Sequence, residues 1–154
     1  MLTLGQIGLG YWGPNLLRNF DTLPGSVVKA VCDLDEDALA RVADRHPDLL
    51  TTTESERLFS DPAIDAIVVT TSAATHYPLA RAALEAGKHV FVEKPIALRI
   101  DEAEALVHLS EDRNLVLMVG HLLLYHPAIV YLKQLVSMGQ LGDVYYVYSA
   151  RRNL

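Results

Sequence analysis

Apolar runs and helix-like stretches alternate along the whole chain. Runs typical of β-strands cover residues 2–7, 27–32, 49–52, 66–71, 89–93 and 115–119. Helical spacing of apolar positions marks residues 12–21, 36–46, 77–87, 101–113 and 128–138, and residues 54–60 fit a short helix. Strands that alternate with helices are typical of a parallel sheet with helices on both faces. We therefore predict an α/β fold with a doubly wound sheet of six strands that ends near residue 119.

Several predicted helices carry capping residues at their ends. Asp35 or Glu36 precedes the second helix, and Asp101 opens the fourth. Thr75 is the candidate N-cap of the helix at 77–87, and Gly87 is placed to end that helix.

The last part of the chain follows a different pattern. Residues 139–142 resemble a helix stop and a turn, and residues 143–150 alternate as an aromatic-rich strand. We expect this strand to be the first of a truncated second α/β domain. The predicted organisation is a domain at 1–120, followed by a linking helix and an incomplete domain at 121–154. A lone strand exposes an edge that favours pairing, so self-association through it is an alternative role for this segment.

One apolar stretch is nearly long enough to span a membrane. Residues 115–132 contain no Asp, Glu, Lys or Arg, but Gly120, His121, His126 and Pro127 interrupt them. Proline disfavours a helical residue before it. We interpret the stretch as a buried strand, a turn and the start of a helix. The start of the chain has no basic region or cleavage site, so we expect neither a signal peptide nor a membrane partner.

Composition narrows the class of protein. The 154 residues are 51% hydrophobic and 21% charged, which is ordinary for a globular domain. A net charge of −6 and a pI near 5.4 argue against a nucleic-acid partner. The single cysteine, Cys32, excludes an internal disulfide and suits the reducing cytoplasm, where we expect the protein to be located. Its position in a strand favours a buried apolar role over that of a reactive thiol.

A glycine motif follows the first predicted strand. Gly8, Gly10 and Gly13 occur in Gly-Leu-Gly-Tyr-Trp-Gly at the start of a helix. The first permits a tight turn, the second lets the backbone approach a pyrophosphate, and the third lets the helix pack closely on the strand. Amides at the helix start then face the phosphates, so we include Tyr11 and Trp12 in the predicted cofactor site. The alternative is a bend that binds nothing.

An acidic residue completes this pattern. Asp33 lies 20 residues beyond Gly13, at the end of the second strand, where it would accept hydrogen bonds from the adenosine ribose. Its charge would repel a 2′-phosphate, and Leu34-Asp35 supplies no cation to receive one. We therefore expect NAD rather than NADP, with Leu34 beside the cofactor.

Two further polar groups follow later strands. Glu93-Lys94-Pro95 ends the fifth strand, at the edge that faces the ligand crevice of an open parallel sheet. Lys94 could anchor a substrate hydroxyl or move a proton, and the alternative is a strand that ends in solvated charges. The loop Thr70–His76 ends the fourth strand, and Thr71, Ser72 and Thr75 could donate to the cofactor. The alternatives are a plain N-cap for Ser72 and Thr75, and a surface position for His76.

Two histidines near the sixth strand are weaker candidates for a functional site. His121 follows that strand, which makes it a weaker candidate for the cofactor crevice. His126 lies five residues later and is better explained as a structural residue. No acid or cysteine accompanies the pair, so we predict no metal site.

Taken in order, these motifs resemble the Gfo/Idh/MocA oxidoreductase family. The resemblance covers the whole chain, and its most specific element is Glu93-Lys94-Pro95 after Ala86-Gly87-Lys88-His89. Tyr11–Asn15 and Leu123–Tyr125 look most like the branch that acts on nucleotide-linked amino sugars, such as UDP-N-acetylglucosamine 3-dehydrogenases. Ser72-Ala73 and Leu124 depart from residues that are common in the family.

The resemblance implies a Rossmann domain that binds NAD or NADP and a second α/β domain for substrate and oligomer contacts. It implies that Lys94 is the active-site lysine and that Asp33, Thr71, His76 and Glu93 line the cofactor. We expect an NAD(P)-dependent dehydrogenase of a sugar or nucleotide-sugar CH–OH group that is a homo-oligomer through its second domain. This chain alone is expected to bind nucleotide with little or no turnover. A non-catalytic NAD-sensing module is the alternative.

Overall fold

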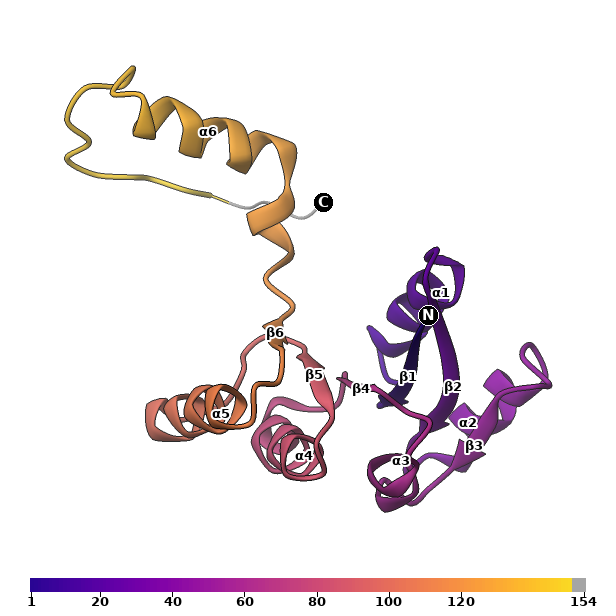
Figure 1. The fold of residues 1–154 in the computed structure, drawn as a ribbon. Helices are drawn as coiled ribbons and strands as arrows, with labels where there is room; N and C mark the ends of the chain where they lie inside the picture. Colours follow the sequence, from indigo (N-terminus) through magenta and orange to yellow (C-terminus); the bar gives the residue numbers. More distant parts are fainter. Residues whose placement is uncertain (151–154) are drawn as a thin grey trace. The chain divides into compact units, whose positions relative to one another are not determined.

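The computed structural model describes residues 1–150, and its central feature is a six-stranded parallel sheet (Figure 1). The strands are β1 (Leu2–Ile7), β2 (Ser26–Cys32), β3 (Leu50–Thr52), β4 (Ala66–Val69), β5 (His89–Val92) and β6 (Leu117–Val119). Their order across the sheet is β3-β2-β1-β4-β5-β6, and every pairing is parallel. The order reverses between β1 and β4, which is the doubly wound arrangement that the sequence predicts.

Each predicted helix is present in the structure. The helices are α1 (Gly13–Thr22), α2 (Glu36–Ala43), α3 (Glu56–Ser60), α4 (Ala73–Glu85), α5 (Ile100–Asp112) and α6 (Pro127–Ser137). Asp35 caps α2 as expected, because its Oδ1 accepts from the N–H groups of Asp37 and Ala38 at 2.9 and 3.1 Å.

Helix α4 begins earlier than predicted. The expected start at residue 77 follows from Thr75 as the candidate N-cap, but the helix begins at Ala73 and Pro78 lies inside it. Two alanines, Ala73 and Ala74, are strong helix formers that carry the helix back to the loop after β4. Thr75 is therefore a first-turn residue, and the prediction that it is the N-cap is wrong; Ser72 occupies that position.

Two hydrophobic clusters show that helices cover both faces of the sheet. Leu17 of α1 and Leu39 of α2 pack with Val31 and Val68 in one cluster. The other joins residues of α3, α4 and α5 to the strands, with Leu58, Leu84, Leu106, Ile67 and Val92 all fully buried. Figure 1 shows α4 beside β5 and α5 beside α4. Because β4 lies between these layers, all four of its side chains are buried, which explains its continuous apolar run.

The chain forms two compact units, Met1–Gly120 and a second one that begins at His121. The stretch 115–132 is divided among β6, a 3₁₀ turn (Leu122–Tyr125) and α6. Strand β6 is not buried as expected, since it is the edge strand and Met118 is 40% exposed. Among the described residues, no helix combines the length and apolar character needed to span a membrane.

The strand expected at residues 143–150 is not formed. Those residues make no ladder within the described part of the chain. An alternating sequence favours an extended backbone, but a strand needs a neighbour to accept and donate its hydrogen bonds.

Candidate functional site

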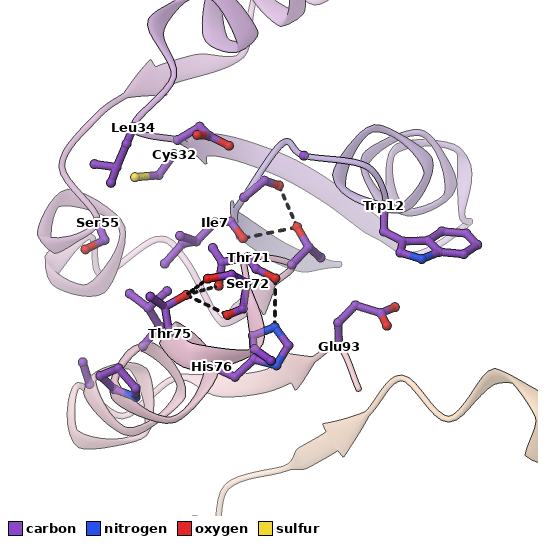
Figure 2. A pocket seen from close by; sticks show the side chains of 18 of the residues that line it. Ile7, Trp12, Cys32, Leu34, Ser55, Thr71, Ser72, Thr75, His76 and Glu93 are labelled. Atoms are coloured by element: carbon purple, nitrogen blue, oxygen red, sulfur yellow. Dashed lines mark hydrogen bonds between the residues drawn. The ribbon is translucent and has the colours of Figure 1, made fainter. Parts of the chain in front are cut away.

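A cavity of about 860 Å³ lies at the carboxyl ends of the strands on both sides of the β1/β4 reversal. That volume is typical of small-molecule and cofactor sites. Figure 2 shows side chains from several loops directed toward it. All the predicted site residues except Gly13 and His121 line the cavity: Gly8, Gly10, Tyr11, Trp12, Asp33, Leu34, Thr71, Ser72, Thr75, His76, Glu93 and Lys94.

The sequence analysis missed part of the cavity wall. Thr53, Ser55, Glu56 and Phe59 line it from the segment after β3. The available signal was topological, because the carboxyl end of β3 opens on the same edge as β1 and β2. Residues within α4, such as Leu79, add an apolar side.

The first and third glycines of the motif are needed by the packing of the protein itself. Gly8 has φ +102°, and a Cβ atom there would lie 2.6 Å from the carbonyl carbon of Thr70. A Cβ on Gly13 would overlap the carbonyl oxygen of Gly8. These residues let the glycine turn contact the end of β4 on one side and the start of α1 on the other.

Gly10 differs from its two neighbours in the motif. A Cβ added at Gly10 would meet no protein atom within 4 Å, so the packing does not require glycine at this position. The backbone N–H groups of Gly10, Tyr11 and Trp12 also donate to no acceptor within residues 1–150. They precede α1, whose N-cap Trp12 offers no side-chain hydrogen bond. Bare backbone, free amides and the positive end of a helix together fit a pyrophosphate.

Two buried polar side chains brace the glycine turn. Gln6 Nε2 donates to the carbonyl oxygens of Gly8 and Gly13 at 3.0 and 2.8 Å. Thr70 Oγ1 donates to Gly8 O at 2.6 Å from the end of β4. Gln6 was missed by the sequence analysis, although a polar residue inside a buried strand was the available signal. Together the two side chains hold the turn in place before any ligand arrives.

Asp33 is bonded to the glycine turn. Its Oδ2 accepts from Leu9 N at 2.5 Å, and its Oδ1 accepts from Asp35 N at 2.9 Å. Each carboxylate oxygen has a further lone pair, so Asp33 keeps acceptor capacity toward the cavity that it lines. The side chain of Leu34 is 87% exposed beside it. The end of β2 thus presents an acceptor and an apolar surface together.

Cys32 lines the same cavity but is not a reactive thiol. The residue is buried, and burial together with the neighbouring Asp33 charge raises the pKa of its thiol to about 11. The thiol therefore stays protonated at neutral pH and is a poor nucleophile. The prediction of a buried apolar role is confirmed.

Hydroxyl groups gather in the loop between β4 and α4. Thr75 Oγ1 lies 2.7 Å from Thr71 Oγ1 and 2.9 Å from the carbonyl oxygen of Ser72, as Figure 2 shows. Ser72 is exposed at the start of α4. The loop thus offers several hydroxyl groups to the cavity.

Glu93 and Lys94 directly follow β5, and the first is buried whereas the second is exposed to solvent. Glu93 is only 6% exposed, so the alternative of a solvated charge is wrong for this residue. Its Oε2 accepts from Lys94 N at 3.2 Å, and its Oε1 lies where a Cβ on Gly120 would be 2.9 Å away. Lys94 is exposed, and its ammonium group makes no hydrogen bond or ion pair with residues 1–150. A free cation therefore stands at the cavity beside a buried carboxylate.

The two candidate histidines differ in their surroundings. His76 is 2% exposed, so the surface position considered for it is wrong. Its Nδ1 and Nε2 lie 2.7 Å from Pro95 O and 3.1 Å from Thr71 O. His121 is exposed, belongs to the second unit and does not line the cavity, so its cofactor role stays a prediction.

Comparison with known proteins gives a consistent picture. Residues 2–121 match the profile of the Gfo/Idh/MocA group, described as an oxidoreductase family with an NAD-binding Rossmann fold. The chain is 36% identical over 146 residues to the uncharacterized oxidoreductase YdgJ of Escherichia coli K12, covering 94% of this chain and 41% of the relative. It is 44% identical over 71 residues to a UDP-N-acetylglucosamine 3-dehydrogenase of Acidithiobacillus ferrooxidans, covering 46% of this chain and 23% of the relative.

A solved structure extends the comparison to the fold. The scyllo-inositol dehydrogenase of Lactobacillus casei, crystallised with NAD(H) and scyllo-inositol, matches with a TM-score of 0.86 at 27% identity. The match covers 93% of this chain and 43% of that one. The chain thus spans about two fifths of the length of such full-length relatives.

Proposed function

Because the chain belongs to the Gfo/Idh/MocA oxidoreductase family, we propose that residues 1–120 bind NAD and that a substrate domain begins at residue 121. Together they would form a dehydrogenase that acts on a hydroxyl-bearing carbon of a sugar or nucleotide-sugar. The observation that carries the cofactor assignment is the unrestricted space at Gly10 beside free backbone amides.

Residues on the β1–β2 side of the cavity would hold the adenosine half. The glycine turn holds the pyrophosphate. Asp33 accepts hydrogen bonds from the ribose hydroxyls and also retains its hydrogen bond from Leu9 N. The exposed Leu34 covers the adenine ring. Asp33 also disfavours a 2′-phosphate by its charge, which supports NAD over NADP.

Residues on the β4–β5 side would surround the nicotinamide half. When bound, the cofactor supplies a hydride acceptor or donor, and the protein supplies position and electrostatics. Lys94 would hold the substrate hydroxyl or share its proton, because its unpaired ammonium stands at this end of the cavity. The names of the two dehydrogenases similar to this chain support a polyhydroxylated substrate.

Asp33→Asn should weaken NAD binding about tenfold to thirtyfold, since a charge-assisted hydrogen bond contributes ~1.5–3 kcal/mol. The loss for NADP should be smaller, because the substitution also removes a repulsive charge. Calorimetric titration of both cofactors measures the change. Asp37→Asn is the matched control, because Asp37 is exposed on α2 and does not line the cavity. Equal losses of NAD affinity in the two variants, or an unchanged ratio of NADP affinity to NAD affinity in Asp33→Asn, would count against the role of Asp33.

A turnover assay separates a dehydrogenase from a sensing module. Residues 1–154 mixed with NAD and either scyllo-inositol or UDP-N-acetylglucosamine should form no NADH. A longer protein in which a substrate domain follows this chain should form NADH with a compound of this kind. NADH production by residues 1–154 alone, or none by the longer protein with any polyol or nucleotide-sugar, would contradict the proposal.

A further inference from the structure

His76 connects two loops that border the cavity. Its ring lies in the first turn of α4 and is almost completely buried. Nδ1 is 2.7 Å from the carbonyl oxygen of Pro95, after β5, and Nε2 is 3.1 Å from that of Thr71, after β4. Figure 2 shows the second of these contacts. The ring therefore spans from one cavity loop to the next.

Each ring nitrogen faces a backbone carbonyl oxygen, which only accepts hydrogen bonds. A ring nitrogen that carries a proton donates to the oxygen that it faces, so the ring can link the two loops. Because both nitrogens lie against carbonyl oxygens of the chain, neither is available to hydrogen-bond to a cofactor.

The two connected loops belong to one end of the cavity. Thr71 precedes Ser72, and Pro95 follows Lys94; both Ser72 and Lys94 line the cavity. In a doubly wound sheet the two halves each bind one mononucleotide of a dinucleotide, and the β4 and β5 loops belong to the second half. Gly10 and Asp33, by contrast, lie on the β1–β2 side.

We propose that His76 is a positioning residue whose buried ring links the β4 and β5 loops and so fixes Ser72 and Lys94 around the nicotinamide half of NAD. This inference rests on the proposed function, because it assigns a role within the same cavity. His76 acts through the two loops and not through a hydrogen bond to the cofactor. Its removal should harm binding of the nicotinamide half and spare the adenosine half.

The test compares NAD with AMP, which lacks the nicotinamide half. His76→Phe fills the ring volume without donors, and it should weaken NAD binding about tenfold while AMP affinity stays within about twofold. His76→Gln, whose amide nitrogen has two N–H groups, should recover part of the loss. Tyr77→Phe is the control on the same helix, since it removes only a 3.3 Å bond from the exposed Arg81.

A spectroscopic measurement on the unaltered chain tests the inference without any variant. NMR of the folded chain should show a ring N–H of His76 that is protected from exchange with water, because it is buried and hydrogen-bonded to a carbonyl oxygen. A ring N–H that exchanges as fast as that of free imidazole, equal losses for NAD and AMP, or unchanged NAD affinity in both His76 variants would overturn the inference. If the unaltered chain binds neither NAD nor AMP, the proposed function itself fails.

Discussion

Gly10→Val should weaken NAD binding by at least about 100-fold, roughly 2.7 kcal/mol, while the chain stays as stable as before. The added side chain would meet no protein atom near its Cβ, so it enters space that the fold leaves open. That space adjoins the free amides before α1, where the pyrophosphate must approach the backbone. Calorimetry gives the affinity, and urea unfolding should show a stability change within ~0.5 kcal/mol.

Gly10→Ala provides a graded control for this steric effect. Its smaller side chain should give an intermediate loss of affinity, again without a change in stability. If Gly10→Val binds NAD as well as the unaltered chain, the pyrophosphate does not lie against this turn. If Gly10→Val unfolds, a side chain at this position does clash with the protein, contrary to the open space around Gly10.

Gly8→Ala should lower the free energy of unfolding by roughly 3 kcal/mol or more, through the fold and not through a ligand. Gly8 has a positive φ of +102°, which a residue with a side chain adopts only at a cost. The added Cβ would also lie 2.6 Å from the carbonyl carbon and 2.7 Å from the carbonyl oxygen of Thr70. Backbone atoms directly after a central strand cannot move aside easily. Urea unfolding without cofactor measures the loss.

Gly87→Ala is the matched control for Gly8→Ala. Gly87 also has a positive φ, +77°, but a Cβ there would meet nothing within 4 Å. Its loss of stability should stay near ~1 kcal/mol, the cost of the backbone conformation alone. The difference between the two variants therefore measures the overlap with Thr70. Equal losses would mean that the glycine turn and the end of β4 do not pack as described.

The parts of the fold that the sequence predicted well depend on local patterns. The continuous apolar run of β4 reflects burial on both faces, and the carboxylate of Asp35 identifies the start of α2. The start of α4 was misplaced, because Thr75 is a suitable N-cap in isolation but lies inside a helix that begins at Ala73. The strand at 143–150 failed for a different reason: pairing depends on a partner strand, which an alternating pattern does not supply.

The residues of the candidate site also divide into those that local sequence patterns predict and those that depend on contacts between distant segments. The glycine motif and Asp33 are recognisable because their spacing follows from one strand–helix–strand unit. Gln6 and the residues after β3 were missed, because their roles depend on contacts between separate segments. The burial of His76 could not be predicted either, because one of its two partners, Pro95, lies 19 residues further along the chain.

The most direct test of NAD binding uses Trp12, the single tryptophan of the chain, which lines the cavity beside the glycine turn. Titration of NADH into residues 1–154 should quench the fluorescence of Trp12 in a saturable way that fits one site, with free tryptophan amide as the control for light absorption. NAD should reverse the quenching by competition, and Gly10→Val should show none. A folded chain whose Trp12 emission follows only the free tryptophan control would contradict the assignment of this cavity as an NAD site.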